Sequence, residues 1–476
     1  MKKILKNERT IEWLLLGLVF AVVLAWSLTT GRPGGPDESM RYAVAKYLYE
    51  HPGSLPRGDE AEILNKIWGI SYAFYPILSY MVSAVFMWIA GIFSTSEEVL
   101  LHAARLADVL FITGAAWFVI QAGKRLFDKE KAFLFSCLVL FLPGFLFLGT
   151  YVNTDSLALL AAAMILYAWA RYLREGWNWK NCILLAVGMA VCFLSYYNAY
   201  GWILWSFFFF CFTVLFCGEG SVKERWKFLF SRGLVIAAIT FVLAGWWFIR
   251  NYFLYDGDIL GRKASTLCAE KYARDGYKPS QHITPAKQGW KIKDFLLYQN
   301  PGWRHNWVMT VLVSFIGVFG TFDLYMNETV SKIYLLFLFI GCVGVLFMLR
   351  EFYWKKRSVT VERTQVGSTK VKVKTIRTSK KWNKKGLFHL AMAAALITPV
   401  ILFITYAYYN DNQAQGRYII SAVYPLMYFI VCGYERLLER FVKKKSLHKW
   451  FYRGAGLIWC LGGILTYFFV ILPHYM

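Results

Sequence analysis

Long apolar blocks are the feature that most constrains the fold of this chain. Eleven of them approach the ~20 residues that a helix needs to cross a bilayer. Because the 476 residues are 58% hydrophobic, a water-soluble core could not bury all the apolar surface. We therefore expect an all-α integral membrane protein. The predicted crossings are 11–29, 102–121, 132–150, 155–172, 182–198, 200–217, 232–250, 332–349, 387–408, 417–434 and 450–472.

Two further apolar segments, 71–92 and 303–320, are interrupted by Pro76 in the first and by glycines in the second. Basic residues cluster in cytoplasmic loops. All the clusters fall on one side only if these two segments do not cross. We therefore predict that both are re-entrant or interfacial, with a cytoplasmic N-terminus, about eleven crossings and an external C-terminus. The basic clusters are 123–131, 171–180, 223–227, 350–385 and 442–449.

This topology divides the chain into three regions. Residues 1–349 form a transmembrane catalytic region with external loops 30–70 and 251–302, the second of which we expect to contain some short helix. The cytoplasmic loop 350–386 is basic, with thirteen Lys and Arg against two acids over 350–385. Its alternating β-branched residues favour a small hairpin over a disordered linker. Residues 387–476 form the C-terminal helices.

The N-terminus resembles a signal peptide, but its apolar run is long, so we expect an uncleaved first helix.

Net charge and cysteine usage exclude other classes. The net charge of +24 lies mainly between the apolar blocks, which is typical of loops facing anionic membrane lipids and excludes nucleic acid as the expected partner. The nine cysteines are scattered without CxxC spacing, so no disulfide framework is predicted.

Acids and arginines from five separate places gather at the predicted external face. Each of these residues also has a simpler interpretation. Asp155 could cap a helix, and the side chain of Arg105 could reach the lipid headgroups. The others could belong to ordinary polar turns. Together they favour transfer from a phosphate-linked lipid, because a carboxylate can act as general base and arginine matches phosphate oxygens. Arg417, with Arg105, would stabilise the leaving phosphate. The residues are Asp37, Glu38, Arg105, Asp155, Arg250, Asp256, Asp258, Asp411, Arg417 and Tyr418.

The order of short motifs resembles the GT-C superfamily of polytopic glycosyltransferases, which use polyprenyl-phosphate sugars, and within it a bacterial family with a PDE motif in the first external loop. The similarity covers nearly the whole chain. The motifs are PDESMRY (36–42), SYAFYPIL (71–78), ARLAD (104–108), VNTDS (152–156), RNYFLYDGD (250–258) and QGRY (415–418).

The resemblance implies a GT-C-like fold in a bacterial cell membrane, with the active face extracytoplasmic. It implies Asp37 as the catalytic base, Asp155 as a second acid and Arg417 as a phosphate ligand. Glu38, next to Asp37, is the other catalytic candidate. The family often has a histidine after the PDE pair, where this chain has Met40-Arg41. Arg41 then becomes a substrate-phosphate candidate, and the role of Glu38 stays open. The candidate substrate-binding residues are Arg41, Arg105, Asp155, Arg250, Asp258, Arg417 and Tyr418.

The expected partners are a polyprenyl-phosphate sugar, membrane lipids and an extracytoplasmic glycan, lipid or protein acceptor. No cofactor is required by the pattern. A divalent cation held by Asp37, Glu38 and Asp155 stays open, since carboxylates suit such ions. Two other classes also stay open: a transporter or flippase of a lipid-linked glycan, and a non-catalytic envelope-assembly protein. A transporter is expected to carry charges near the middle of its helices, whereas here they lie at one face.

Overall fold

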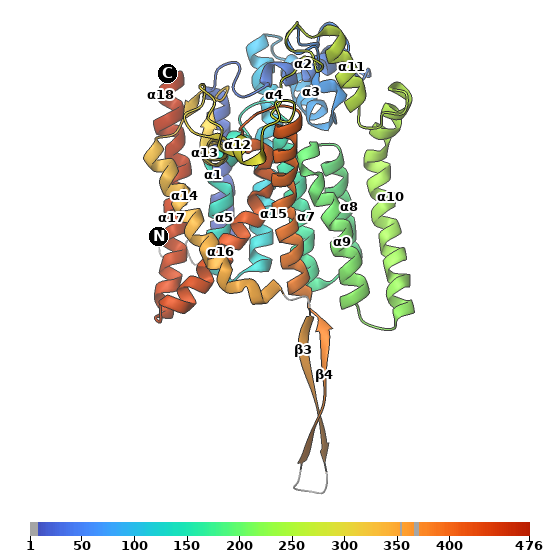
Figure 1. Cartoon of the computed structure of the whole chain (residues 1–476), viewed down its shortest axis with the longest axis vertical. Coiled ribbons are helices and arrows are strands. Elements are labelled where there is room, and N and C mark those ends of the chain that lie inside the picture. Colours follow the sequence, from blue (N-terminus) through green and yellow to red (C-terminus); the bar gives the residue numbers. More distant parts are fainter. Residues whose placement is uncertain (1–7, 353–354, 366–370) are drawn as a thin grey trace.

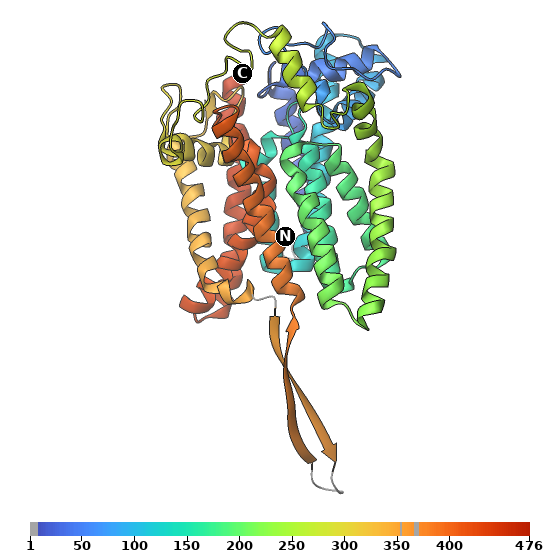
Figure 2. The same cartoon turned by 45° about the vertical axis from the view of Figure 1, so that its right-hand side comes forward.

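The structure, a computed structural model, describes residues 8–352, 355–365 and 371–476. Its helices run side by side between two ends (Figures 1 and 2). Within the described residues, nine helices are long and apolar enough to cross a membrane, as expected for a multi-pass membrane protein. They are α1 (Glu8–Thr29), α4 (Glu97–Leu126), α7 (Asp155–Glu175), α9 (Tyr200–Cys217, continuing from η3, Tyr197–Ala199), α10 (Val222–Leu254), α14 (Glu328–Val345, continuing into η4, Leu346–Phe352), α15 (Lys384–Tyr409), α16 (Val423–Phe441, continuing from η5, Gly416–Ala422) and α17 (Lys445–Thr466, continuing into η6, Tyr467–Ile471, and α18, Leu472–Tyr475).

Two predicted crossings are shorter than expected. The predicted helix 132–150 is instead α5 (Lys129–Leu140) followed by α6 (Pro143–Phe147). The break falls at Pro143, because proline has no N–H to continue the α5 hydrogen-bond ladder. The predicted helix 182–198 ends early, since α8 spans Trp179–Phe193. Both segments still lie within the bundle (Figure 1).

One end of the bundle carries short helices and the long loops. The two interrupted segments become α3 (Leu78–Gly91) and α13 (Trp307–Gly317), with 14 and 11 residues. Figure 1 places both helices at this end of the bundle, in agreement with the prediction that these segments do not cross. The C-terminal α18 lies at the same end (Figure 1). The other elements there are α2 (Glu38–Glu50), η2 (Tyr72–Phe74), α11 (Arg262–Tyr272), α12 (Ile292–Leu297), β1 (Val318–Phe319) and β2 (Leu324–Tyr325).

A β-hairpin projects from the opposite end (Figures 1 and 2). Strand β3 (Lys355–Gln365) pairs antiparallel with β4 (Val371–Trp382), from Lys355 opposite Trp382 to Gln365 opposite Val371. The hairpin predicted within 355–385 is therefore confirmed, and its turn, 366–370, lies outside the described residues.

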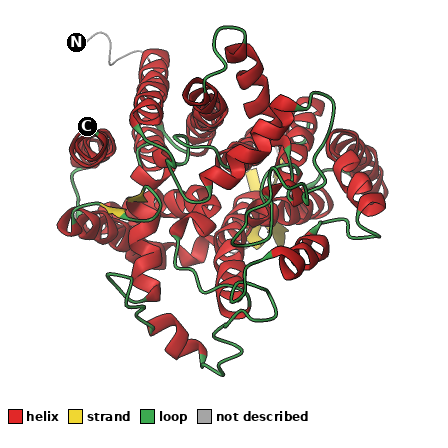
Figure 3. Ribbon diagram, turned by 90° about the horizontal axis from the view of Figure 1, so that it is seen from above, coloured by secondary structure: helices red, strands yellow, loops and turns green. Residues whose placement is uncertain are grey.

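Helix α7 lies at the centre of the bundle, packed against α4 and α8. Viewed from above, the helices of the bundle lie packed side by side (Figure 3). Its alanines, among them Ala161, Ala162 and Ala168, are fully buried. Small side chains allow helix backbones to approach in a membrane, where packing replaces the hydrophobic effect as the source of helix association. This packing fixes Asp155, the first residue of α7, at the end of the bundle that carries the short helices and the long loops.

Candidate active site

A tight turn follows α1 and sets the position of the PDE motif. A Cβ on Gly34 would lie 2.7 Å from Nη2 of Arg105, and a Cβ on Gly35 would lie 2.6 Å from the ring of Tyr151. The two glycines are therefore required by close approach rather than by loop flexibility. Asp37 then adopts the left-handed conformation, with φ 63°, which aspartate tolerates better than most residues. As a result, the adjacent Asp37 and Glu38 make separate sets of contacts.

Glu38 is 1% exposed and forms a bidentate ion pair with Arg105, at 2.7 and 2.8 Å. It also accepts hydrogen bonds from the backbone N–H groups of Gly34 and Val152. The Arg105 guanidinium donates further hydrogen bonds to the carbonyls of Ser27, Thr30 and Gly31. In this arrangement neither side chain is free to contact a substrate. We name Glu38 and Arg105 the turn clamp.

Asp37 contacts Arg417, which comes from the far end of the chain. The Arg417 Nη2 lies 2.6 Å from Oδ2 of Asp37, and the side chains are 10% and 33% exposed. Arg417 Nε donates to Gln415 and Nη1 donates to the Pro36 carbonyl. Burial alone would raise the pKa of Asp37, but the charges of Arg417 and Arg41 and the hydroxyl of Tyr72 lower it below its ordinary value. Asp37 is therefore ionised at neutral pH.

The second acid, Asp155, lies beside Arg41. Both are almost completely buried, and Arg41 Nη2 is 4.0 Å from Oδ2 of Asp155. Arg41 Nη1 donates to the Thr154 hydroxyl, at 2.7 Å. Arg41 Nε and Asp155 Oδ2 have no hydrogen-bond partner among the described residues. The N-cap position of α7 is Thr154, whose side chain makes no capping bond. The first turn is held instead by Asn153, whose Oδ1 accepts from the N–H of Ser156. Asp155 is therefore not needed as the helix cap, which was its simpler interpretation.

Tyrosine rings complete the site. The Arg41 guanidinium lies over the rings of Tyr72, at 4.4 Å, and Tyr196, at 5.7 Å. Tyr72 belongs to the SYAFYPIL motif, whose aromatic residues were the available signal. The Arg417 guanidinium lies over the ring of Tyr418, a predicted site residue, 5.2 Å from the ring centroid. The Tyr418 hydroxyl donates a hydrogen bond to Oε1 of Gln413. The aromatic rings therefore cover both arginines of the site.

The structure places two predicted site residues away from this cluster. Arg250 donates to the carbonyl of Pro56 and to the side chain of Asn251. Asp258 accepts from the N–H of Ala264 and thereby holds the first turn of α11. Both residues secure the long loops at this end of the bundle instead of meeting Asp37.

The acids do not form a metal site in this arrangement. Within the described residues, no group of three His, Cys, Asp or Glu side chains is placed to hold an ion. The oxygens of Glu38 are committed to Arg105, and Asp37 faces Arg417. The residues that the sequence offered for a divalent cation therefore do not fit one here.

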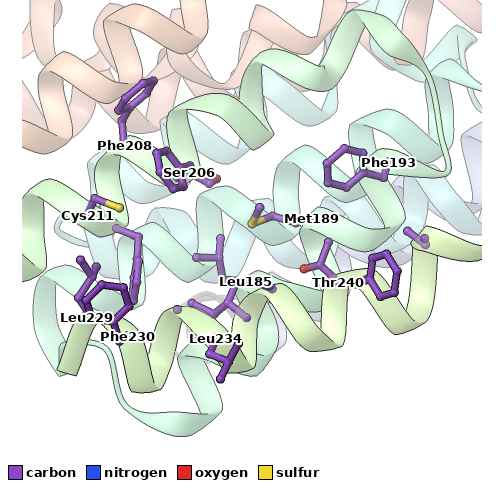
Figure 4. A pocket seen from close by; sticks show the side chains of 18 of the residues that line it. Leu185, Met189, Phe193, Ser206, Phe208, Cys211, Leu229, Phe230, Leu234 and Thr240 are labelled. Carbon is purple, nitrogen blue, oxygen red and sulfur yellow. The ribbon is translucent and has the colours of Figure 1, made fainter. Parts of the chain in front are cut away.

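An open apolar groove of about 1050 Å³ lies between α8, α9 and α10. Its lining includes Leu185, Phe208 and Leu234, one from each helix (Figure 4). At one end the ring of Phe193 contacts Tyr200, which contacts Tyr197, which in turn contacts Tyr75. A continuous series of aromatic rings therefore links the groove to the segment that carries Tyr72.

The structure is therefore a polytopic bundle with a charged site at one end and an apolar groove beside it. The sequence of residues 81–247, about a third of the chain, matches the family described as dolichyl-phosphate-mannose-protein mannosyltransferase. No curated protein matches the sequence significantly.

Two solved structures share this architecture. The apo oligosaccharyltransferase of Archaeoglobus fulgidus is similar over 98% of this chain, with 13% identity and a TM-score of 0.54, and the match covers 56% of that protein. ArnT from Cupriavidus metallidurans, bound to undecaprenyl phosphate, is similar over 98% of this chain and 74% of its own, with 11% identity and a TM-score of 0.51. The present chain thus spans little more than half the length of the oligosaccharyltransferase. The GT-C-like fold predicted from the sequence is confirmed.

Proposed function

We propose that this protein transfers a sugar from a polyprenyl-phosphate-linked donor to an acceptor outside the cytoplasm. The single observation that carries the proposal is the pair formed by Asp37 and Arg417, at 2.6 Å, on the partly exposed side of the site. In this pair a carboxylate that can act as a general base lies next to a guanidinium that can bind phosphate. The groove between α8 and α10 offers space of the right polarity for a polyprenyl chain.

The proposed reaction is a single displacement. The carboxylate of Asp37 takes the proton of an acceptor hydroxyl while the hydroxyl oxygen bonds to the anomeric carbon of the sugar. The bond between that carbon and the phosphate oxygen breaks, and the polyprenyl phosphate leaves with the electron pair. Arg417, assisted by the charge of Arg41, stabilises the negative charge that develops on the phosphate. Because attack and departure occur on opposite sides, the anomeric configuration inverts.

The remaining predicted residues have supporting roles in this proposal. The turn clamp positions the backbone on which Asp37 is carried. Asp155 balances the charge of Arg41, and Arg250 and Asp258 hold the loops that surround the acceptor. The basic clusters opposite the site favour an extracytoplasmic active face, in a bacterial cell membrane as the family resemblance implies.

The test is transfer by the purified full-length protein in detergent. A panel of radiolabelled polyprenyl-phosphate sugars is offered with a mixture of envelope glycans, lipids and proteins as acceptors. We expect loss of label from the lipid with wild type and a reduction of at least 100-fold with Asp37→Asn, since general-base catalysis contributes 10²- to 10⁴-fold. The exposed Asp275, paired with Lys278 in an external loop, supplies the control Asp275→Asn, which we expect to retain activity. Full activity in a folded Asp37→Asn protein would refute the role of Asp37, and label retained with every sugar would refute the transferase.

A further inference from the structure

In this structure the proposed base, Asp37, and the proposed phosphate ligand, Arg417, form an ion pair with each other. Arg417 presents Nη2 to Asp37 and Nη1 to the carbonyl of Pro36, and its Nε donates to Gln415. The guanidinium therefore has its outer edge turned towards the PDE turn. A phosphate that bound this edge would meet the carboxylate of Asp37 at the same nitrogen.

Carboxylate and phosphate oxygens are alternative partners for one guanidinium edge, because both accept charge-assisted hydrogen bonds with similar geometry. A base that is ion-paired with arginine is also a weaker base than a free one. The contact between Asp37 and Arg417 consequently opposes both steps of the proposed reaction, phosphate binding and proton removal.

We propose that the phosphate of the lipid carrier displaces Asp37 from Arg417, so that the base becomes free only when the carrier is bound. This inference rests on the proposed function for the use of the freed base, but the displacement is a binding event in its own right. The polyprenyl phosphate product keeps Arg417 occupied until it departs, after which Asp37 closes onto Arg417 again.

The surroundings of Asp37 allow it to leave its partner without becoming an unpaired buried charge. Its side chain is 33% exposed, so water can solvate the released carboxylate. The charge of Arg41 and the hydroxyl of Tyr72 continue to act on it. Loss of Arg417 raises the pKa of Asp37 towards its ordinary value, which makes the carboxylate a better proton acceptor. Arg41, which is 1% exposed, cannot replace Arg417 as the first contact for an incoming phosphate.

The displacement makes an unusual prediction for a catalytic variant. Asp37→Asn, which removes the competing charge, binds the carrier phosphate more tightly than wild type while losing transfer. The measurement is the dissociation constant of undecaprenyl phosphate for the full-length protein in detergent. We expect Asp37→Asn to bind at least tenfold tighter and Arg417→Gln to bind weaker. In the double variant Asp37→Asn with Arg417→Gln, the gain from removing Asp37 disappears.

Two controls separate displacement from general electrostatic repulsion. Asp411 is an acid close enough for its charge to act on Asp37. Its carboxylate accepts a hydrogen bond from Gln413 and makes no ion pair with Arg417 among the contacts of the described residues. Asp411→Asn therefore removes the same charge without freeing Arg417, and we expect less than a twofold gain. Undecaprenol, which lacks the phosphate, is expected to bind wild type and Asp37→Asn equally. Inorganic phosphate, used as a competitor, distinguishes recognition of the headgroup alone from recognition of the whole lipid.

The inference is overturned if Asp37→Asn binds undecaprenyl phosphate no tighter than wild type, if Asp411→Asn gains as much, or if the gain persists without Arg417. Should Asp37→Asn fold poorly, Asp37→Gly is the second variant, because glycine accepts the positive φ of this position. Absence of transfer by wild type together with tighter binding by Asp37→Asn would remove the proposed function and leave the displacement standing.

Discussion

Each partner of the turn clamp is surrounded by backbone groups as well as by the other partner. Arg105 binds three carbonyls and Glu38 accepts from two N–H groups. Loss of one side chain therefore leaves a buried charge and several buried polar groups unsatisfied, which costs more than the ion pair itself contributes.

We predict that Glu38→Gln and Arg105→Met each destabilise the folded protein by about 3–5 kcal/mol, measured as a large drop in melting temperature in detergent. Replacing both partners of a buried pair with apolar residues is often neutral. Here the double variant Glu38→Met with Arg105→Met should stay as unstable as the single ones, because the backbone groups remain unpaired. A stable double variant would contradict this account.

The depressed pKa of Asp37 links its ion pair to acid stability. Burial opposes ionisation, but Arg417, Arg41 and Tyr72 outweigh it, so the folded-state pKa lies below the unfolded value of about 3.9. The stabilisation is then present above the unfolded pKa and lost as the pH falls through the folded pKa. The melting temperature of wild type should exceed that of Asp37→Asn by a constant amount above pH ~5, and the difference should shrink below pH ~4. A difference that grows on acidification would exclude this pairing.

Helices α14 and α16 meet through glycines, and the contact leaves no room for a side chain. A Cβ on Gly433 would lie 2.0 Å from the carbonyl oxygen of Gly341, and a Cβ on Gly344 would lie 2.3 Å from that of Gly433. The obstructing atoms are backbone, so the helices themselves must separate.

We predict that Gly433→Ala lowers stability by about 1–3 kcal/mol, the usual cost of overpacking. Gly454, within α17, has no atom within 4 Å of the added Cβ, so Gly454→Ala supplies a matched helical control that should leave the melting temperature unchanged or slightly raised. Equal effects of the two substitutions on thermal unfolding would show that the close contact does not limit stability.

The whole molecule has two chemically different ends. The hairpin β3–β4 projects from one end, and α2, α11 and the C-terminal α18 lie at the other (Figure 1). The positive-inside rule assigns the hairpin end to the cytoplasm. Ser39, next to the proposed site, and Ser446, at the start of α17, are both exposed and are assigned to opposite sides.

We predict that Ser39→Cys reacts with a membrane-impermeant maleimide in intact cells and that Ser446→Cys reacts only after the membrane is opened. The parent protein, which contains nine cysteines, is the background control. Labelling of Ser446→Cys in intact cells, with Ser39→Cys protected, would invert the topology and move the site to the cytoplasmic side.

Hydropathy and charge along the sequence determined the membrane class, most of the crossings and the end at which Asp37, Asp155 and Arg417 gather. These properties follow locally, because each crossing reverses the side on which the next loop emerges. The hairpin also followed from local alternation. The break at Pro143 was missed because an apolar run of sufficient length conceals a backbone interruption.

Which charges pair was decided only by the tertiary structure. In the sequence Asp37 and Glu38 are equivalent neighbours, yet one faces Arg417, 380 positions away, and the other is locked to Arg105. Arg250 and Asp258 share the end of the bundle with these residues but hold loops instead. Pairing depends on the lateral packing of helices and on the left-handed turn at Asp37. Hydropathy places a residue at a depth in the membrane, but it carries no information about which helix lies beside it.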